Sequence, residues 1–195
     1  MAAYNVRFGA MAVAPQKIYK TANTNMKYNK AYTEGVIFEK YLEYLDTIKE
    51  ELPKDLFEFV SDSNRHDLYE KSLHDSWVKS VECSHNFETK TADITLILLG
   101  AYHDRIFILC FHNVSQYKIS QQMFDRDLIT YEIGIEKDCN NYDKEEKLVF
   151  RAEFAGEETE IEIYSEEINI VEEIIKEQEN GQPLSASEGD SAAGQ

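Results

Sequence analysis

Two His-Asp pairs are the residues whose types could do metal or acid–base chemistry. His74-Asp75 and His103-Asp104 each put an imidazole beside a carboxylate, and His112 adds a third imidazole. A catalytic zinc site needs three protein ligands that converge, and no His-x-x-x-His or Cys-x-x-Cys spacing is present to arrange them. We therefore expect no metal ion and no cofactor, and we expect His74 and Asp75 to form local hydrogen bonds in a turn before a strand.

Other signatures of catalysis are weak. The three cysteines, Cys83, Cys110 and Cys139, have no paired spacing, and we expect Cys83 and Cys110 to be core residues of strands. There is no Gly-x-Ser-x-Gly nucleophile motif and no glycine-rich phosphate loop. An enzyme remains an alternative interpretation: a small hydrolase or transferase whose acids and bases are the histidines and Asp75 named above, in a cleft between sheet and helix.

Composition excludes several kinds of partner. The chain has 195 residues, 37 acids against 20 bases, and a formal net charge of −17. Binding to nucleic acid or to an anionic membrane depends on Lys and Arg, so we expect neither partner. No apolar stretch approaches the roughly 20 residues of a spanning helix. The apolar run from Phe8 to Ala14 is interrupted by Gly9 and is a poor signal peptide, so we expect a cytoplasmic protein.

Two helices are predicted after an N-terminal segment, residues 1–33, that has no clear pattern. Apolar residues recur at spacings of three and four from Glu34 to Leu52, which predicts an amphipathic helix with one buried stripe. Pro53 is suited to a first helical turn, so a second short helix is expected from Pro53 to Val60.

The middle of the chain has the period of two that is typical of strands. Short loops between the segments favour antiparallel neighbours, because a parallel crossover needs a dozen or more residues. Two segments, Ile94 to Leu99 and Ile106 to Phe111, are apolar on both faces and are expected at the centre of the sheet. The six predicted strands are Trp77 to Cys83, Ala92 to Leu99, Arg105 to Val114, Asp127 to Ile135, Lys147 to Phe154 and Glu158 to Tyr164.

A C-terminal helix is predicted next. Ser165 is a suitable N-cap, and a helix from Glu166 to Glu179 would carry an apolar stripe and end before Gly181. The expected fold is therefore α+β: N-terminal helices packed on a mostly antiparallel sheet of about six strands, followed by a C-terminal helix. We expect a single domain over 34–180 and a disordered tail over 181–195, preceded by an N-terminal segment, 1–33, whose structure the sequence does not predict.

The acidic residues concentrate in the last third of the chain. From Glu136 to Glu179 there are 16 acids against five bases. Strand alternation puts five glutamates on one solvent-facing side of adjacent strands: Glu132, Glu136, Glu153, Glu160 and Glu162. Two interpretations stay open. The face could be a solvated coat that aids solubility, or it could be a docking surface for a basic protein.

A resemblance bears on this choice. The motif Leu73-His74-Asp75-Ser76-Trp77-Val78, preceded by a helix and a short linker, resembles a group of uncharacterised bacterial proteins with an LHD-type start to an antiparallel sheet. Some of these proteins lie beside polymorphic-toxin genes and are regarded as immunity proteins. The resemblance covers about residues 34–115 and implies a small cytoplasmic binding protein that neutralises a toxin.

The leading hypothesis combines the charge and the resemblance. We expect an immunity-type protein whose acidic sheet face, the five glutamates, masks a basic cognate toxin. Besides the hydrolase or transferase, a third interpretation is a structural or oligomeric subunit. In that case the apolar side of the central strands would be closed by residues 1–33, by the C-terminal helix, or by a second copy of the chain in a homodimer.

Overall fold

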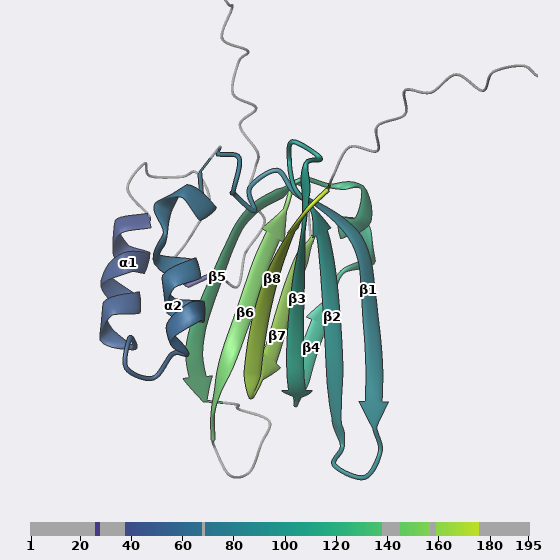
Figure 1. Cartoon of the computed structure of the whole chain (residues 1–195). Coiled ribbons are helices and arrows are strands. Elements are labelled where there is room, and N and C mark those ends of the chain that lie inside the picture. The colour runs from purple at the N-terminus through teal and green to yellow at the C-terminus, as the bar shows by residue number, and fades with distance from the viewer. Residues whose placement is uncertain (1–25, 28–37, 68, 138–144, 157–158, 176–195) are drawn as a thin grey trace, which may run out of the picture.

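The computed structural model describes residues 26–27, 38–67, 69–137, 145–156 and 159–175. These residues form two helices, α1 (Phe38–Thr47) and α2 (Lys54–Ser61), followed by eight strands (Figure 1). The strands are β1 (Trp77–Asn86), β2 (Thr91–Leu99), β3 (Arg105–Val114), β4 (Gln116–Ile119), β5 (Leu128–Lys137), β6 (Glu146–Phe154), β7 (Glu160–Ser165) and β8 (Glu167–Ile174). Short 3-10 turns lie at Ser63–Arg65 and Gln121–Asp125.

The strands form two antiparallel sheets rather than one. The first sheet has the order β1-β2-β3-β8 and the second has the order β4-β7-β6-β5. The α+β class is confirmed, and all six predicted strands are present. Strands β4 and β8 are additional. Strands β2 and β3 lie at the centre of the first sheet, as their apolar sequences predict.

Two long strands bend from one sheet into the other. β3 continues into β4 after Ser115, and β7 continues into β8 after a break at Glu166. The pairing is kept through the bend, because Ser115 N–H donates to the Tyr164 carbonyl (3.0 Å) and Glu166 N–H donates to the His112 carbonyl (3.1 Å). The two sheets are therefore joined by a continuous ladder along one line.

The predicted C-terminal helix is wrong in its described part, because Glu167–Ile174 is strand β8. This segment is rich in β-branched residues, and pairing along β3 satisfies its backbone while Ile168 is buried in the core. The tertiary pairing overrides the helical spacing of its apolar residues. Residues 176–195 and 1–25 lie outside the described ranges, so the predicted tail and most of the N-terminal segment do too.

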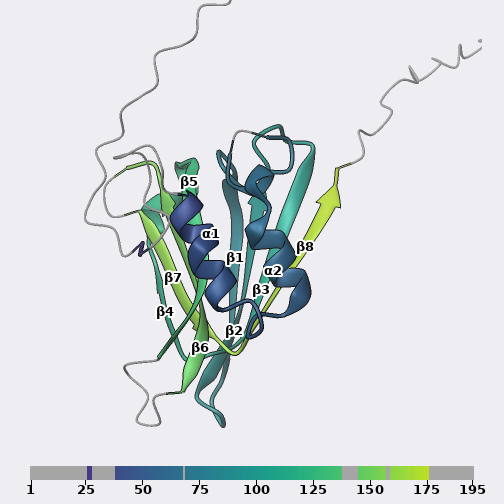
Figure 2. The ribbon, with the colours of Figure 1, turned by 90° about the vertical axis from the view of Figure 1, so that its left-hand side faces the viewer.

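The core lies between the two sheets and continues under the helices. Its largest fully buried side chains include Phe107 and Phe111 from the first sheet and Tyr131 and Phe150 from the second. Figure 2 shows α1 and α2 over the open side between β5 and β8. The predicted helical stripe is confirmed for Tyr41 and Leu45, which are buried in α1. The helix ends at Thr47, short of the predicted Leu52, and Ile48 and Leu52 are buried in the turns that follow it.

Tyrosines of α1 satisfy the backbone of edge strand β5. The Tyr41 hydroxyl donates to the Ile133 carbonyl (2.9 Å) and accepts from the Ile133 N–H (2.7 Å). Tyr44 does the same at Ile135, at 3.4 and 2.9 Å. Gly134 permits this approach, because a Cβ there would lie 2.8 Å from the Tyr44 hydroxyl. Helix α1 thus covers a strand edge that would otherwise expose polar groups.

The outer face of the first sheet has an apolar centre, flanked by polar residues such as Glu82 of β1 and Glu173 of β8. Ile97, Leu99, Ile106 and Ile108 are half-buried there, and Val171 is exposed. Figure 1 shows this face toward the viewer, and no described helix or strand covers it. In the described ranges no helix is long and apolar enough to span a membrane.

The Tyr41 bridge predicts an asymmetry between two conservative variants. Tyr41→Phe removes both hydrogen bonds at a fully buried site, so we expect a loss of about 1–3 kcal/mol in the free energy of unfolding. Tyr44→Phe should cost less, because its site is partly exposed to water. Urea denaturation of the two variants measures the difference. Equal losses would show that the Ile133 backbone is satisfied in another way.

Candidate functional site

The five predicted glutamates lie on the outer face of the second sheet. Across the strands Glu132 is opposite Arg151, and Arg151 is opposite Glu162. Glu153 is opposite Glu160, and Glu136 follows Glu132 on β5 with the same orientation. The sequence prediction that these side chains share one face is therefore confirmed.

Arg151 lies at the centre of this acidic sheet face and pairs with three of the glutamates. Its two Nη atoms lie 2.6 and 2.9 Å from the carboxylate oxygens of Glu136, and its Nε lies 3.0 Å from Glu162 Oε2. A longer contact of 3.4 Å joins Arg151 Nη1 to Glu132 Oε1. The Arg151 side chain is 6% exposed. One buried cation thus binds three carboxylates.

Lys27 adds a second cation from the N-terminal side. Its backbone N–H donates to Glu132 Oε1 at 2.9 Å, and its Nζ lies 2.6 Å from Glu136 Oε1. Burial alone would raise the pKa of Glu136, but hydrogen bonds from Arg151 and Lys27 outweigh it and hold the pKa below its usual value. The face therefore holds part of the N-terminal segment in place.

Glu153 and Glu160 form a different arrangement. Burial raises the pKa of Glu153 to about 7, and the adjacent charge of Glu160 adds to the effect. Glu153 Oε2 is buried and has no hydrogen-bond partner in the described part of the chain. Glu160 pairs with Lys118 of β4. Glu153 is thus a carboxyl group that can stay protonated near neutral pH.

The expectation that this face is exposed to solvent is wrong: two of the five glutamates are buried, and the side chains of the other three are only 14–18% exposed. Glu132 is 2% exposed and Glu153 is 7% exposed. Both lie in the middle of a sheet face on which Met26 is also buried, so alternation placed them on the correct face without determining whether water covers it. The proposed partner-binding role of the five glutamates stays a prediction.

The histidines of the alternative enzyme do not form one group. His74 Nδ1 lies 2.9 Å from Asp75 Oδ1 without the geometry of a hydrogen bond, and the local hydrogen bond of His74 runs from its backbone N–H to Ser72 Oγ at 2.8 Å. The His103 ring packs edge-on against Trp77 with 5.0 Å between ring centroids. His112 lies near the other end of β3, beside Asp93. Among the described residues, no group of three His, Cys, Asp or Glu side chains could hold a metal ion.

A pocket of about 310 Å³, the end pocket, lies where the LHD motif leads into β1. Asp75 N–H donates to the Leu128 carbonyl (2.8 Å), and Leu128 N–H donates to the Ser76 carbonyl (2.9 Å), so the turn is fixed against the start of β5. Trp77 Nε1 donates to Asp127 Oδ1 at 2.5 Å. The lining residues are Tyr69, His74, Asp75, Trp77, Ala101, Tyr102 and Asp127.

Three aromatic residues of the end pocket are exposed. Tyr69, Trp77 and Tyr102 are 56%, 46% and 61% exposed, and the lining includes two carboxylates but no Lys or Arg. Sequence reasoning singled out His74 and Asp75 but missed the aromatic residues and Asp127. Trp77, the single tryptophan of the chain and part of the motif, was the available signal.

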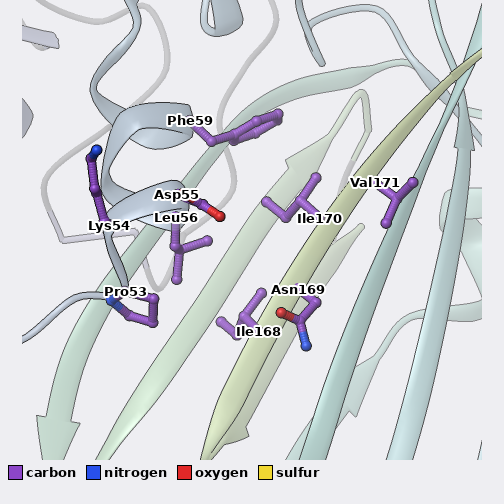
Figure 3. A pocket seen from close by; sticks show the side chains of 9 residues that line it. All are labelled: Pro53, Lys54, Asp55, Leu56, Phe59, Ile168, Asn169, Ile170 and Val171. Atoms are coloured by element: carbon purple, nitrogen blue, oxygen red, sulfur yellow. The ribbon is translucent and has the colours of Figure 1, made fainter.

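A second concave region, the α2–β8 groove, has a volume of about 480 Å³. Figure 3 shows Leu56 and Phe59 of α2 on one side and Ile168 and Ile170 of β8 on the other. Among the described strands β8 is an edge strand, with β3 as its sheet neighbour. A groove between a helix and a sheet edge is the geometry in which an extended peptide can add as a strand.

Cys83 is exposed, so the prediction that it is a core residue is wrong. Its Sγ lies 3.5 Å from His85 Nε2 and 3.9 Å from the Tyr117 hydroxyl. The hydrogen bond with Cys83 raises the pKa of Tyr117. Sequence reasoning missed this contact, because Tyr117 comes from a strand of the other sheet. Cys110 is half-buried, and Cys139 lies outside the described residues.

The sequence matches no protein-family model and no curated protein.

Loss of Arg151 should destabilise the fold. Arg151→Met leaves three carboxylates without their shared cation, and one of them, Glu132, is only 2% exposed, so we expect a loss of about 3–5 kcal/mol in the free energy of unfolding. Lys118→Met is the matched control, since the Lys118 side chain is 62% exposed and should contribute little. Urea denaturation of both variants is the measurement. Equal, small losses would contradict the role given to Arg151.

Glu153 should make stability depend on pH. Its raised pKa means that the folded state holds a proton that the unfolded state has released, so the free energy of unfolding falls as pH rises from about 4.5 to about 7. Glu153→Gln keeps the shape and removes the titration. We expect the variant to gain stability over the native protein at about pH 8 but not at about pH 4. A gain that is equal at both pH values would show an ordinary pKa for Glu153.

Proposed function

We propose that this chain is a small acidic binding protein of the cytoplasm whose partner is a basic protein. Its role would be that of an immunity-type protein that masks the active surface of a basic toxin. The observation that carries the proposal is the end pocket, which combines exposed aromatic residues with carboxylates and has no Lys or Arg among its described lining residues.

Exposed aromatic residues favour a binding role. Tyrosine and tryptophan are enriched in protein interfaces, where they supply large contact areas with little loss of side-chain freedom. Tyr69, Trp77 and Tyr102 come from three separate segments of the chain and gather at one pocket. Such a cluster is costly in water unless another molecule covers it, which supports an interface at this end.

The charge of the chain supports a basic partner. A net charge of −17 speeds the encounter with a cationic protein and opposes binding to anionic surfaces. The acidic sheet face contributes less to this field than its sequence implies, because Arg151, Lys27 and Lys118 offset its carboxylates. Exposed acids on α1, including Glu39, Glu43 and Asp46, add to the field.

A hydrolase or transferase is the second candidate, favoured by the His74-Asp75 contact inside the end pocket. The lining residues include no Ser, Thr, Cys or Lys that could act as a nucleophile. An enzyme at this site would therefore need His74 or a carboxylate to activate water. If the His74→Gln variant still binds the partner but no longer protects growth, that result would favour the enzyme.

Co-expression with the product of the neighbouring gene tests the leading proposal. We expect a complex on gel filtration at low salt that weakens as salt is raised, because the attraction between opposite charges is screened. We also expect growth to be protected from the neighbouring protein. An unrelated protein of similar size and negative charge is the control and should neither bind nor protect. Absence of both complex and protection would contradict the proposal.

A further inference from the structure

We propose that the end pocket binds the guanidinium group of an arginine side chain presented by the basic partner. The proposal rests on the proposed function, because the arginine belongs to that partner. It goes further by naming the chemical group that is recognised and the residues that recognise it: Tyr69, Asp75, Trp77, Tyr102 and Asp127.

The carboxylates of the pocket each keep an oxygen for a ligand. Asp127 uses Oδ1 to accept from Trp77 Nε1, and Asp75 uses Oδ1 in its contact with His74. The contacts given above leave the Oδ2 atom of each aspartate without a hydrogen bond to a described residue. The Asp75 side chain is 41% exposed. Two anionic acceptors in one pocket without a Lys or Arg favour a cationic ligand.

The aromatic residues favour arginine over other cations. A cation over an aromatic face is attracted by the ring, and this attraction is strongest for tryptophan. A guanidinium is planar, stacks on aromatic faces and donates along several edges at once, whereas an ammonium is a compact and strongly hydrated charge. Trp77 is held in a fixed orientation by Asp127 on one side and by the His103 ring on another. The pocket thus presents a rigid aromatic surface beside two acceptors.

The size and the surroundings of the pocket fit a side chain rather than a large molecule. Its volume of about 310 Å³ is at the low end of small-molecule sites. The turns that form it are fixed by backbone hydrogen bonds from Asp75 and Leu128 and, in the β2–β3 turn, by the His103 N–H donating to the Gly100 carbonyl at 2.8 Å. Little ordering is therefore needed when an arginine enters.

Trp77 provides the measurement, because it is the single tryptophan of the chain. We would titrate the full-length protein with N-acetyl-arginine amide at low, constant ionic strength and follow Trp77 fluorescence. We expect a saturable change. N-acetyl-citrulline amide, which has nearly the same shape without the charge, should give no change. N-acetyl-lysine amide should bind at least about threefold more weakly than arginine amide.

Two isosteric variants test the carboxylates. Asp127→Asn keeps an acceptor for Trp77 Nε1 and removes the charge, and we expect arginine amide to bind at least about fivefold more weakly. Asp75→Asn should have an effect in the same direction. Asp125→Asn is the matched control, since Asp125 is exposed nearby but does not line the pocket, and it should leave binding unchanged. Circular dichroism of each variant checks that the fold is kept.

Three results would overturn the proposal: no saturable change with arginine amide, an equal response to citrulline amide, or unchanged binding in both folded carboxylate variants. The small probe separates this proposal from the proposed function. If arginine amide binds but no complex with the basic partner forms, the proposed function fails and the site stands. If the complex forms and Asp127→Asn leaves its affinity unchanged, the partner binds elsewhere and the proposal for the partner's arginine fails.

Discussion

Two bent strands belong to both sheets, and the rest of the architecture follows from them. Because β3 becomes β4 and β7 becomes β8 without loss of pairing, the sheets are joined along one line and diverge on either side of it. One open side is covered by α1 and α2, where Tyr41 satisfies the backbone of β5. At one end, β1 meets the start of β5 through Trp77 and Asp127, and the end pocket lies there.

The outer faces of the two sheets differ in their side chains. The outer face of the first sheet has an apolar centre that no described element covers, whereas the second has carboxylates around a buried arginine. Desolvation offsets much of the attraction between a buried cation and its anionic partners. The charge of Arg151 also disfavours other registers of β5, β6 and β7, since a slip by one residue would place it in the apolar core.

Local periodicity predicted α1, α2 and the six main strands, because each depends on its own apolar pattern. It failed at β8, where Ile168, Val171 and Ile175 also fit a helical stripe and only pairing with β3 decides. Alternation predicted which glutamates share a face, but register across strands placed Arg151 among them, and register depends on contacts distant in sequence. The end pocket was missed for the same reason, since its lining comes from four segments.

His74 and Asp75 of the LHD motif line the end pocket, and the rest of the motif shapes the turn there. Leu73 and Ser76 are fully buried, and Asp75 has a positive φ of 60°, a conformation that Asp tolerates better than most residues. Two backbone hydrogen bonds then fix the turn: Asp75 N–H donates to the Leu128 carbonyl, and Leu128 N–H donates to the Ser76 carbonyl. The fixed turn holds Asp75 and Trp77 at the end pocket. A preformed site of this kind loses little conformational entropy when a ligand binds.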